Sequence, residues 1–340
     1  MKIIPHSMIK NVITQAEAFN LVRDNFIRQK NFLLPPKISI KYGEADFMNT
    51  MPCVMLDDGI AGVKVVSRHL GRTPTLTAKI LLFDSNTGDA LALLDGDYIT
   101  VLRTGAVAAL AAETFAVKGY KRIGIWGLGN TARATFDVLS VMKNSVPLEV
   151  FLLRYKNQAE NFVDTFSHLN NVKFFICDTY EEVAENSQVL ISCVSDTKKI
   201  FCDVEKYPAG ILILPVQSKG FQNCDLVFDK IFADYTAQIK DFKYFPQFSK
   251  LNYGGELTDI LTGKVAGRTS NTERILSYNI GIATHDLRFA NEIYKRVGNL
   301  CEDFDLESPT EKFYYESIRP SAPPRLSRVT SEFLSLQSVA

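Results

Sequence analysis

The sequence predicts an α/β fold built around a doubly wound parallel sheet, and three observations support this prediction. From Lys121 onward, short apolar runs alternate with helical runs, as in a chain that winds through strand, helix and strand. The first of these apolar runs leads directly into the glycine-rich segment GLGNTA. Before Lys121 several strand-like runs follow one another without helices between them, which indicates a second, mostly antiparallel sheet.

The N-terminal part is predicted to hold one helix, four strands and a second helix. Residues 8–31 carry apolar side chains at helical spacing. The strand-like runs are KISIKY, AGVKVVS, AKILLFD and DALALLD, with turn signals such as Asp57–Gly59 and Asn86–Gly88 between them. An alanine-rich helix then begins near Thr100 and ends at Gly119, a residue type that often follows the last helical turn.

The C-terminal part is predicted to hold six strands with helices between them. The strands are RIGIW, LEVFLL, VKFFI, QVLISCV, GILILPV and LVFDKIFA, and the helices are Thr131–Met142, Ala159–His168 and a short one near Tyr180–Glu185. Residues 238–268 are less regular, and a last long helix is expected over Asn279–Val297. Beyond Ser308 the polar, proline-containing chain predicts a surface tail or a disordered end.

The bulk composition narrows the function classes. The 340 residues suggest about two domains. Lys and Arg together number 38, as do Asp and Glu, so no charge excess points to nucleic acid or to a membrane surface. The six cysteines form no CxxC pair and the four histidines lack ligand spacing, so neither a metal site nor a disulfide framework is expected. The N-terminus lacks a long apolar signal, and a reduced, cytoplasmic protein is the expectation.

The segment KRIGIWGLGNTARATF predicts a dinucleotide site. An apolar strand runs into Gly127, Gly129 and Ala132, and a helical pattern follows. The first glycine allows the tight turn, the second lets the backbone approach a diphosphate, and the small third residue lets helix and strand pack closely. The helix N-terminus, with Asn130 and Thr131, then offers N–H groups to the phosphates. The alternative is a glycine turn that binds another nucleotide or nothing.

The residues after the second strand bear on the type of dinucleotide. An acidic residue at this point commonly holds the ribose 2′-hydroxyl of NAD. Here Arg154 and Lys156 stand instead, and cations can pair with the 2′-phosphate of NADP. Arg133 in the phosphate-loop helix is a second candidate contact. The sequence therefore favours NADP, with NAD possible; alternatively Arg154 stacks on the adenine or faces solvent.

Several motifs together resemble the ornithine cyclodeaminase and mu-crystallin family. They are Met51-Pro52 followed by KVVSRH, LLFDSNTGDALALLD, DGDYITVLRTG at 95–105, GLGNTA, and GKVAGR at 263–268. The resemblance extends from about Lys37 to about Lys295. It implies a Rossmann domain over 114–284, a discontinuous α+β substrate-binding and dimerisation domain over 1–113 with 285–310, and a tail over 311–340. A homodimer is implied as well.

The resemblance also implies roles for individual residues. Lys64 matches a lysine that contacts the substrate carboxylate or amino-acid head, and a buried lysine is costly unless it is paired. Arg103 matches an arginine that holds the carboxylate; the alternative is a structural ion pair. Thr104 matches a phosphate contact, Thr75 a substrate contact, and Ser192 and Ser195 contacts near the nicotinamide. Asn279 and Gly281 match residues at the start of the last helix, where the family closes on the nicotinamide. His69 is a candidate for substrate specificity, although a surface histidine is the alternative.

Three positions depart from the family pattern. Lys37 replaces an arginine, Asn49 replaces a glutamate, and Lys219 falls where cyclodeaminases carry an aspartate thought to shuttle a proton. A protonated lysine offers only donors, and it would repel the side-chain ammonium of ornithine. Cyclisation of ornithine is therefore not expected. The alternative is that Lys219 points away from the site and another acid, such as Asp225 or Asp286, takes this role.

Hydride transfer does not depend on the missing acids. The expected chemistry is NAD(P)-dependent dehydrogenation, deamination or imine reduction at the Cα of an amino acid or an N-substituted amino acid. The catalytic candidates are Lys64, Arg103 and Lys219. The alternative is a catalytically impaired NADP(H)-binding protein of the mu-crystallin type. A small amino-acid-like molecule is the expected partner, with neither nucleic acid nor membrane.

Overall fold

The computed structural model describes residues 1–43, 45–194, 199–307 and 309–315. Met1–Phe304 form one compact unit and Asp305–Ala340 a second, whose described residues form neither helix nor strand. Within the described residues, no helix has the length and apolar character needed to cross a membrane. The six cysteines are all free thiols.

The first sheet is mostly antiparallel, as predicted. Its strands follow the order β1-β7-β6-β5-β4-β2, and β3 pairs with the exposed part of β4. β1 and β7 pair in parallel. The strands are β1 (Lys2–Ile4), β2 (Phe32–Leu33), β3 (Ile38–Lys41), β4 (Phe47–Met55), β5 (Ile60–Arg68), β6 (Leu76–Asp84) and β7 (Ala90–Asp95).

The second sheet is parallel and its core strands are buried on both faces. Its order is β10-β9-β8-β11-β12-β15-β13-β14. All six predicted strands are present, whereas β14 and β15 were not predicted. The strands are β8 (Arg122–Trp126), β9 (Leu148–Leu153), β10 (Val172–Cys177), β11 (Val189–Ser192), β12 (Leu212–Pro215), β13 (Lys230–Ala233), β14 (Tyr253–Glu256) and β15 (Ile275–Tyr278).

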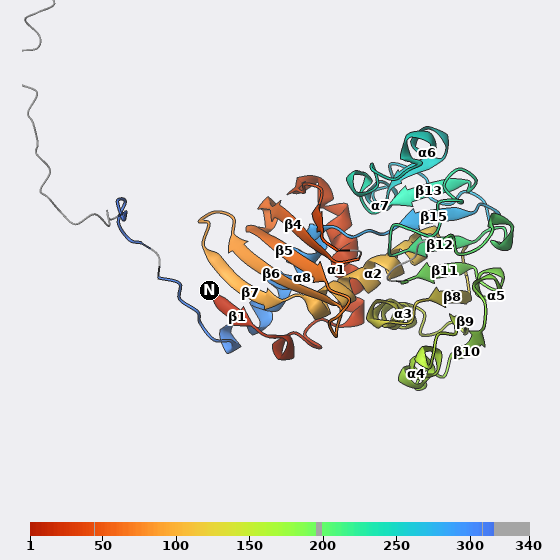
Figure 1. The fold of residues 1–340 in the computed structure, drawn as a ribbon, viewed down its shortest axis with the longest axis horizontal. Coiled ribbons are helices and arrows are strands. Elements are labelled where there is room, and N and C mark those ends of the chain that lie inside the picture. The colour runs from red at the N-terminus through yellow and green to blue at the C-terminus, as the bar shows by residue number, and fades with distance from the viewer. Residues whose placement is uncertain (44, 195–198, 308, 316–340) are drawn as a thin grey trace, which may run out of the picture. The chain divides into compact units, whose positions relative to one another are not determined.

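Helices pack between and around these sheets, and α2 touches both: it contacts β6 of the first sheet and β12 of the second (Figure 1). The α-helices are α1 (Gln15–Ile27), α2 (Asp97–Phe115), α3 (Asn130–Met142), α4 (Gln158–Thr165), α5 (Tyr180–Glu185), α6 (Phe245–Leu251), α7 (Leu257–Leu261) and α8 (Ala283–Val297). Short 3-10 helices cover His6–Met8, Gln29–Asn31, Leu56–Asp58, Val204–Lys206, Thr236–Gln238 and Gly298–Leu300.

Several helix boundaries differ from the prediction: α2 spans Asp97–Phe115 rather than about 100–119, and α4 ends at Thr165 rather than His168. Two further differences have local reasons. The first helix begins at Gln15 rather than near residue 8, because the Thr14 hydroxyl accepts from the backbone N–H of Glu17 while the Glu17 carboxylate accepts from the Thr14 N–H. The last helix begins at Ala283 rather than Asn279. The residues before it form buried β15, and Gly281 has φ 93°, which is outside the helical range.

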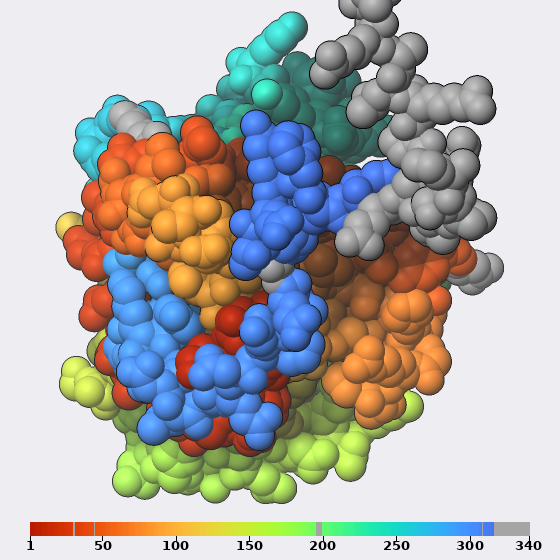
Figure 2. Space-filling model, turned by 90° about the vertical axis from the view of Figure 1, so that its left-hand side faces the viewer, coloured from red at the N-terminus to blue at the C-terminus, as the bar shows by residue number. Residues whose placement is uncertain are grey.

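The end of the first unit returns to the N-terminal sheet. Helix α8 packs against β4, β5 and β6. Beyond it, the N–H of Ile3 donates to Glu302, and Lys2 pairs with Asp303 at 2.8 Å; Figure 2 shows the red N-terminal residues beside the blue C-terminal ones. Both ends of this unit therefore build the same sheet layer, whereas the domain boundaries themselves stay a prediction.

Candidate active site

The glycine-rich loop forms an open cradle at the start of α3. Gly127 has φ 76°, and a Cβ there would lie 2.7 Å from the backbone of Cys193, so the turn requires glycine. At Gly129 an added Cβ would meet nothing within 4 Å. Ala132 is fully buried against the sheet. The open space lies at a helix N-terminus, where unpaired N–H groups suit a diphosphate.

The other predicted cofactor residues surround this cradle with different environments. Asn130 is exposed and Thr131 half-buried in the first turn of α3. The Thr104 hydroxyl donates to Thr100 at 2.6 Å within α2. Ser192 ends β11, is buried, and accepts from Gln217 Nε2 at 2.6 Å. Ser195 lies outside the described residues.

Asn279 and Gly281 follow the end of β15, which lies between β12 and β13 in the parallel sheet. Asn279 is buried, its Nδ2 donates to Ser277, and its Oδ1 has no partner among the described residues. The backbone N–H of Gly281 donates to Asp234. A side chain at Gly281 would collide with the guanidinium of Arg103. These two residues thus connect the parallel sheet to the buried charges described below.

The three cations predicted to select NADP have competing contacts. Arg154 donates to Asp178 and to Glu160 at 2.7 Å each and is about half exposed. Lys156 has a left-handed φ of 52°, and its ammonium lies 5.5 Å from the centre of the Tyr155 ring. Arg133 donates to Asn161 and Thr165 of α4, and its guanidinium lies over Phe162. Arg133 is therefore held by the neighbouring helix in this structure.

A cleft of about 540 Å³ opens beside the cradle and is lined from both sheets. Thr131, Cys193 and Val194 line it from the cradle side. The loop after β12 contributes Val216–Lys219. The N-terminal sheet contributes a set of polar and cationic residues: Lys37, Ser39, Lys41, Asn49, Arg68 and Thr75. The predicted substrate residues Lys37, Asn49 and Thr75 and the catalytic candidate Lys219 thus line one cavity with Thr131.

Strand pleating explains this grouping. Side chains alternate between the two faces of a strand, so Lys37, Ser39 and Lys41 all face the cleft, whereas Ile38 and Ile40 face the other way and are 60% and 57% exposed. Ser39 pairs with Asn49, and both line the cleft. The Asn49 Oδ1 is buried without a partner among the described residues, so it is an acceptor for a ligand N–H.

Lys64 and Arg103 do not line this cleft in the structure; both are buried and share one carboxylate. Lys64 Nζ lies 2.7 Å from Asp286 Oδ2, and Arg103 Nε donates to Asp286 Oδ1 at 2.9 Å. The short distance makes the Lys64 contact an ion pair. Burial and the nearby Arg103 lower the pKa of Lys64 to about 7, against the opposing effect of Asp286.

A second buried carboxylate, Asp234, interacts electrostatically with both Arg103 and Lys37. Burial raises the pKa of Asp234 to about 6, although the backbone N–H groups of Gly281 and Ile280 and the charges of Lys37 and Arg103 oppose the shift. Burial also lowers the pKa of Lys37, and Asp234 counteracts this. The charge of Lys37, which lines the cleft, therefore interacts with the buried charges of Asp234 and Arg103.

Two histidines take other positions. His69 does not belong to the described cleft lining; its Nε2 is 3.0 Å from the hydroxyl of Tyr42, and its backbone N–H donates to the carbonyl of Thr75. The predicted specificity role of His69 therefore has no direct contact to support it. His285 is fully buried beside Phe26 and Asn25, and burial lowers its pKa well below the usual range, so it is neutral.

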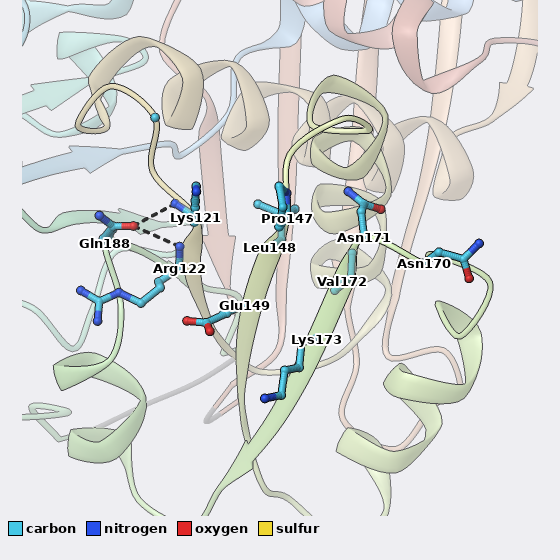
Figure 3. A pocket seen from close by; sticks show the side chains of 11 residues that line it. Lys121, Arg122, Pro147, Leu148, Glu149, Asn170, Asn171, Val172, Lys173 and Gln188 are labelled. Carbon is cyan, nitrogen blue, oxygen red and sulfur yellow. Dashed lines mark hydrogen bonds between the residues drawn. The ribbon is translucent and has the colours of Figure 1, made fainter.

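A larger hollow of about 690 Å³ lies at the opposite edge of the parallel sheet (Figure 3). Residues at the amino ends of β8, β9 and β10 line it, and Gln188 accepts there from the backbone N–H groups of Lys121 and Arg122. In doubly wound sheets ligands bind outside the carboxyl ends of the strands. The smaller cleft beside the cradle is therefore the candidate active site.

A glycine cradle at a helix N-terminus, opening into a cationic cleft, is the arrangement of a dinucleotide-dependent oxidoreductase. Comparison with known proteins agrees. Residues 3–299 match the ornithine cyclodeaminase/mu-crystallin family, and the chain belongs to that family. The membership confirms the family and the Rossmann-type fold predicted from the sequence, together with the class of enzyme, which acts with NAD(P) on the amine or imine of amino acids.

Individual relatives cover most of the chain at low identity. The ornithine cyclodeaminase of Brucella melitensis is 27% identical over 310 residues, 85% of this chain and 83% of its own. The Delta(1)-pyrroline-2-carboxylate reductase of Bacillus cereus is 24% identical over 328 residues, which are 86% of this chain and 99% of the relative. An archaeal alanine dehydrogenase, solved as a dimer with bound NAD, superposes with a TM-score of 0.80 at 23% identity, covering 90% and 99%.

The sequence suggested no role for Asp234, and it suggested Asp286 only as an alternative source of the acid that is missing at Lys219. The sequence contains a signal for Asp286, because an aspartate in the first turn of a helix is common at a positive helix end. Its position opposite Lys64 and Arg103 depends on α8 packing against β5, more than 180 residues away in the chain. Spacing alone cannot reveal such a contact.

We predict that Asp286→Asn lowers the free energy of unfolding by about 3 to 5 kcal/mol, because it leaves two buried cations without their shared carboxylate. Urea unfolding followed by circular dichroism measures this loss. Asp303→Asn is the matched control: Asp303 pairs with Lys2 at the surface, where water screens the charges, and little change is expected. Equal stability of Asp286→Asn and wild type would contradict the assigned role.

Proposed function

We propose that the protein interconverts the Cα amine and imine of an amino acid or an N-substituted amino acid, using a nicotinamide dinucleotide. One observation carries this proposal: Thr131 of the phosphate cradle and the cationic face of β3 line the same cleft. A ligand in that cleft is therefore adjacent to the dinucleotide site. The relatives named above act on substrates of this kind according to their names.

The chemistry balances as a two-electron transfer. In the oxidative direction the substrate loses a hydride from Cα and a proton from nitrogen, and a C=N bond forms. The bound nicotinamide supplies the hydride acceptor in this direction and the donor in reverse. The imine either remains, or water adds and releases ammonia.

The residues of this chain bind and orient the substrate. Lys37 lines the cleft and interacts electrostatically with the buried Asp234 and Arg103, so we assign it to the substrate carboxylate. The unpaired Asn49 oxygen is assigned to the substrate N–H. Lys64 and Arg103 keep their predicted importance, but through Asp286 they support this wall from beneath rather than contacting the cleft.

The rival function is a dinucleotide-binding protein of the mu-crystallin type without turnover. The observation that favours this rival is the lack of any aspartate or glutamate in the described cleft lining, where an acid could shuttle protons. Dinucleotide binding is common to both functions, and only turnover separates them.

We predict turnover of the protein with NAD(P)H, ammonia and 2-oxo acids, or with NAD(P)⁺ and amino acids, and no useful formation of proline from ornithine. Nicotinamide absorbance and product analysis measure this. Gly127→Ala should abolish dinucleotide binding, whereas Gly71→Ala, at an open surface position, should change nothing. Binding without turnover over the whole panel would leave the rival function, and robust proline formation would contradict the role given to Lys219.

The preference for NADP stays a prediction and forms part of this proposal. Arg154, Tyr155 and Lys156 follow β9 without an acidic residue among them. The two carboxylates on Arg154 compete with a 2′-phosphate for the same guanidinium. We therefore expect a modest preference rather than an absolute one.

We predict that wild type binds NADPH more tightly than NADH and that removing the competing carboxylates enlarges the ratio. The variant Asp178→Asn with Glu160→Gln should raise it, and Arg154→Ala should remove it, in fluorescence titrations of both cofactors. Glu205→Gln, at an exposed site on another element, is the control. Equal affinities in all four proteins would sink the assignment of Arg154.

We also propose that the protein is a homodimer formed through the outer face of its N-terminal sheet. Leu33, Ile38 and Ile40 are each more than half exposed there, and a contiguous exposed apolar face indicates an interface. The cytoplasmic location and the domain boundaries given above remain part of the proposal; the six free thiols agree with a reducing compartment.

We predict that sedimentation of wild type gives twice the mass of one chain, and that Ile38→Lys with Ile40→Lys gives a monomer. In this double variant the two new lysines would lose their hydration at the dimer interface without gaining a carboxylate partner. Leu251→Lys is the control, since Leu251 is 67% exposed on α6. A monomeric wild type, or a dimer that survives both lysines, would move the interface elsewhere.

A further inference from the structure

We propose that the substrate carries a second anionic group, a carboxylate or a phosphate on its side chain, which Lys41 and Lys219 hold at the outer part of the cleft. This inference rests on the proposed function, because it names the substrate class of the same site. It follows from the distribution of charge along the cleft.

The inner charges are nearly balanced by their own carboxylates. Lys64 and Arg103 share Asp286 through ion pairs, and the buried charge of Asp234 acts on Lys37 over a longer distance. Three cations and two carboxylates leave one positive charge when all are ionised. One substrate carboxylate is enough to compensate for this charge. The inner end of the cleft therefore suits the α-carboxylate that every amino acid carries.

The outer charges have no such compensation. Lys41 and Lys219 both line the cleft, and neither forms an ion pair with a described residue. No aspartate or glutamate is among the described residues of the lining. Arg68 lines the cleft as well, but it is held by the Ala45 carbonyl and the Phe47 ring, and we assign it no ligand.

The spacing of the cations sets a minimum size for the ligand. Lys37 and Lys41 lie on one face of an extended segment, and four residues at about 3.3 Å each place their Cα atoms about 13 Å apart. Lys219 comes from the loop after β12, on the parallel-sheet side of the cleft. Flexible lysine side chains can converge on a ligand from these positions, provided that its two anionic groups are several bonds apart.

The same charges exclude the opposite class. A substrate with a side-chain ammonium would place a third cation between Lys41 and Lys219 with no acidic group in the described lining to receive it. Like charges brought together in a partly desolvated cleft repel each other. Charge repulsion alone therefore makes the cleft favour a substrate with a side-chain anion over one with a side-chain ammonium.

The experiment compares matched 2-oxo acids with ammonia and reduced cofactor: 2-oxoglutarate against 2-oxopentanoate, which has the same carbon chain without the second carboxylate. We expect kcat/KM for the diacid to exceed that for 2-oxopentanoate by about tenfold or more, which is the effect of one favourable contact. Lys219→Gln and Lys41→Gln should each reduce that ratio by about tenfold. Lys250→Gln, an exposed lysine on α6 outside the cleft lining, should retain it.

Binding of inert probes tests the anion site independently of turnover. Glutarate should bind the protein–cofactor complex at least about tenfold more tightly than pentanoate in calorimetry. The variant Lys219→Glu should instead bind a diamine more tightly than glutarate. A phosphonate analogue of glutarate separates a carboxylate site from a phosphate site. Equal binding of glutarate and pentanoate would overturn the inference even if both 2-oxo acids turn over, whereas selective glutarate binding without any turnover would overturn only the proposed function.

Discussion

The shared contact of Lys64 and Arg103 with Asp286 is the constraint on which the arrangement of the site depends. It joins β5, α2 and α8, three elements from distant parts of the chain. Burying two cations is costly, and one well-placed carboxylate makes it possible. Because α2 contacts both sheets, the ion pair of Arg103 joins the buried carboxylate of α8 to a helix that packs against both sheets.

The close approach of backbones supports the same arrangement. A Cβ at Gly105 of α2 would lie 2.6 Å from the backbone of Ala134 and Thr135 in α3, so these helices pack with no side chain between them. Gly281 likewise leaves room for the guanidinium of Arg103. Glycine at these two points lets the parallel sheet, its cradle and the buried charges occupy adjacent positions.

In the function that we propose, the inner charges hold the carboxylate that all amino-acid substrates share. The outer lysines would then distinguish one substrate side chain from another. In a family whose relatives share the fold at low identity, such differences in cleft lining are where substrates diverge. Lys219, in the loop after a parallel strand, is placed where loops commonly carry function.

The sequence by itself determined the secondary structure of most elements, the cradle and the family, because these depend on local patterns: strand alternation, GLGNTA and the spacing of motifs. It also identified Lys37, Asn49, Thr75 and Lys219, which the structure brings to one cleft. Only the tertiary structure decided that Lys64 and Arg103 are paired with Asp286 behind the cleft, and that Arg154 is held by Asp178 and Glu160. The Asp286 pairs and the Asp178 contact join residues far apart in sequence, and the choice of partner for a charge is set by packing, which no local pattern encodes.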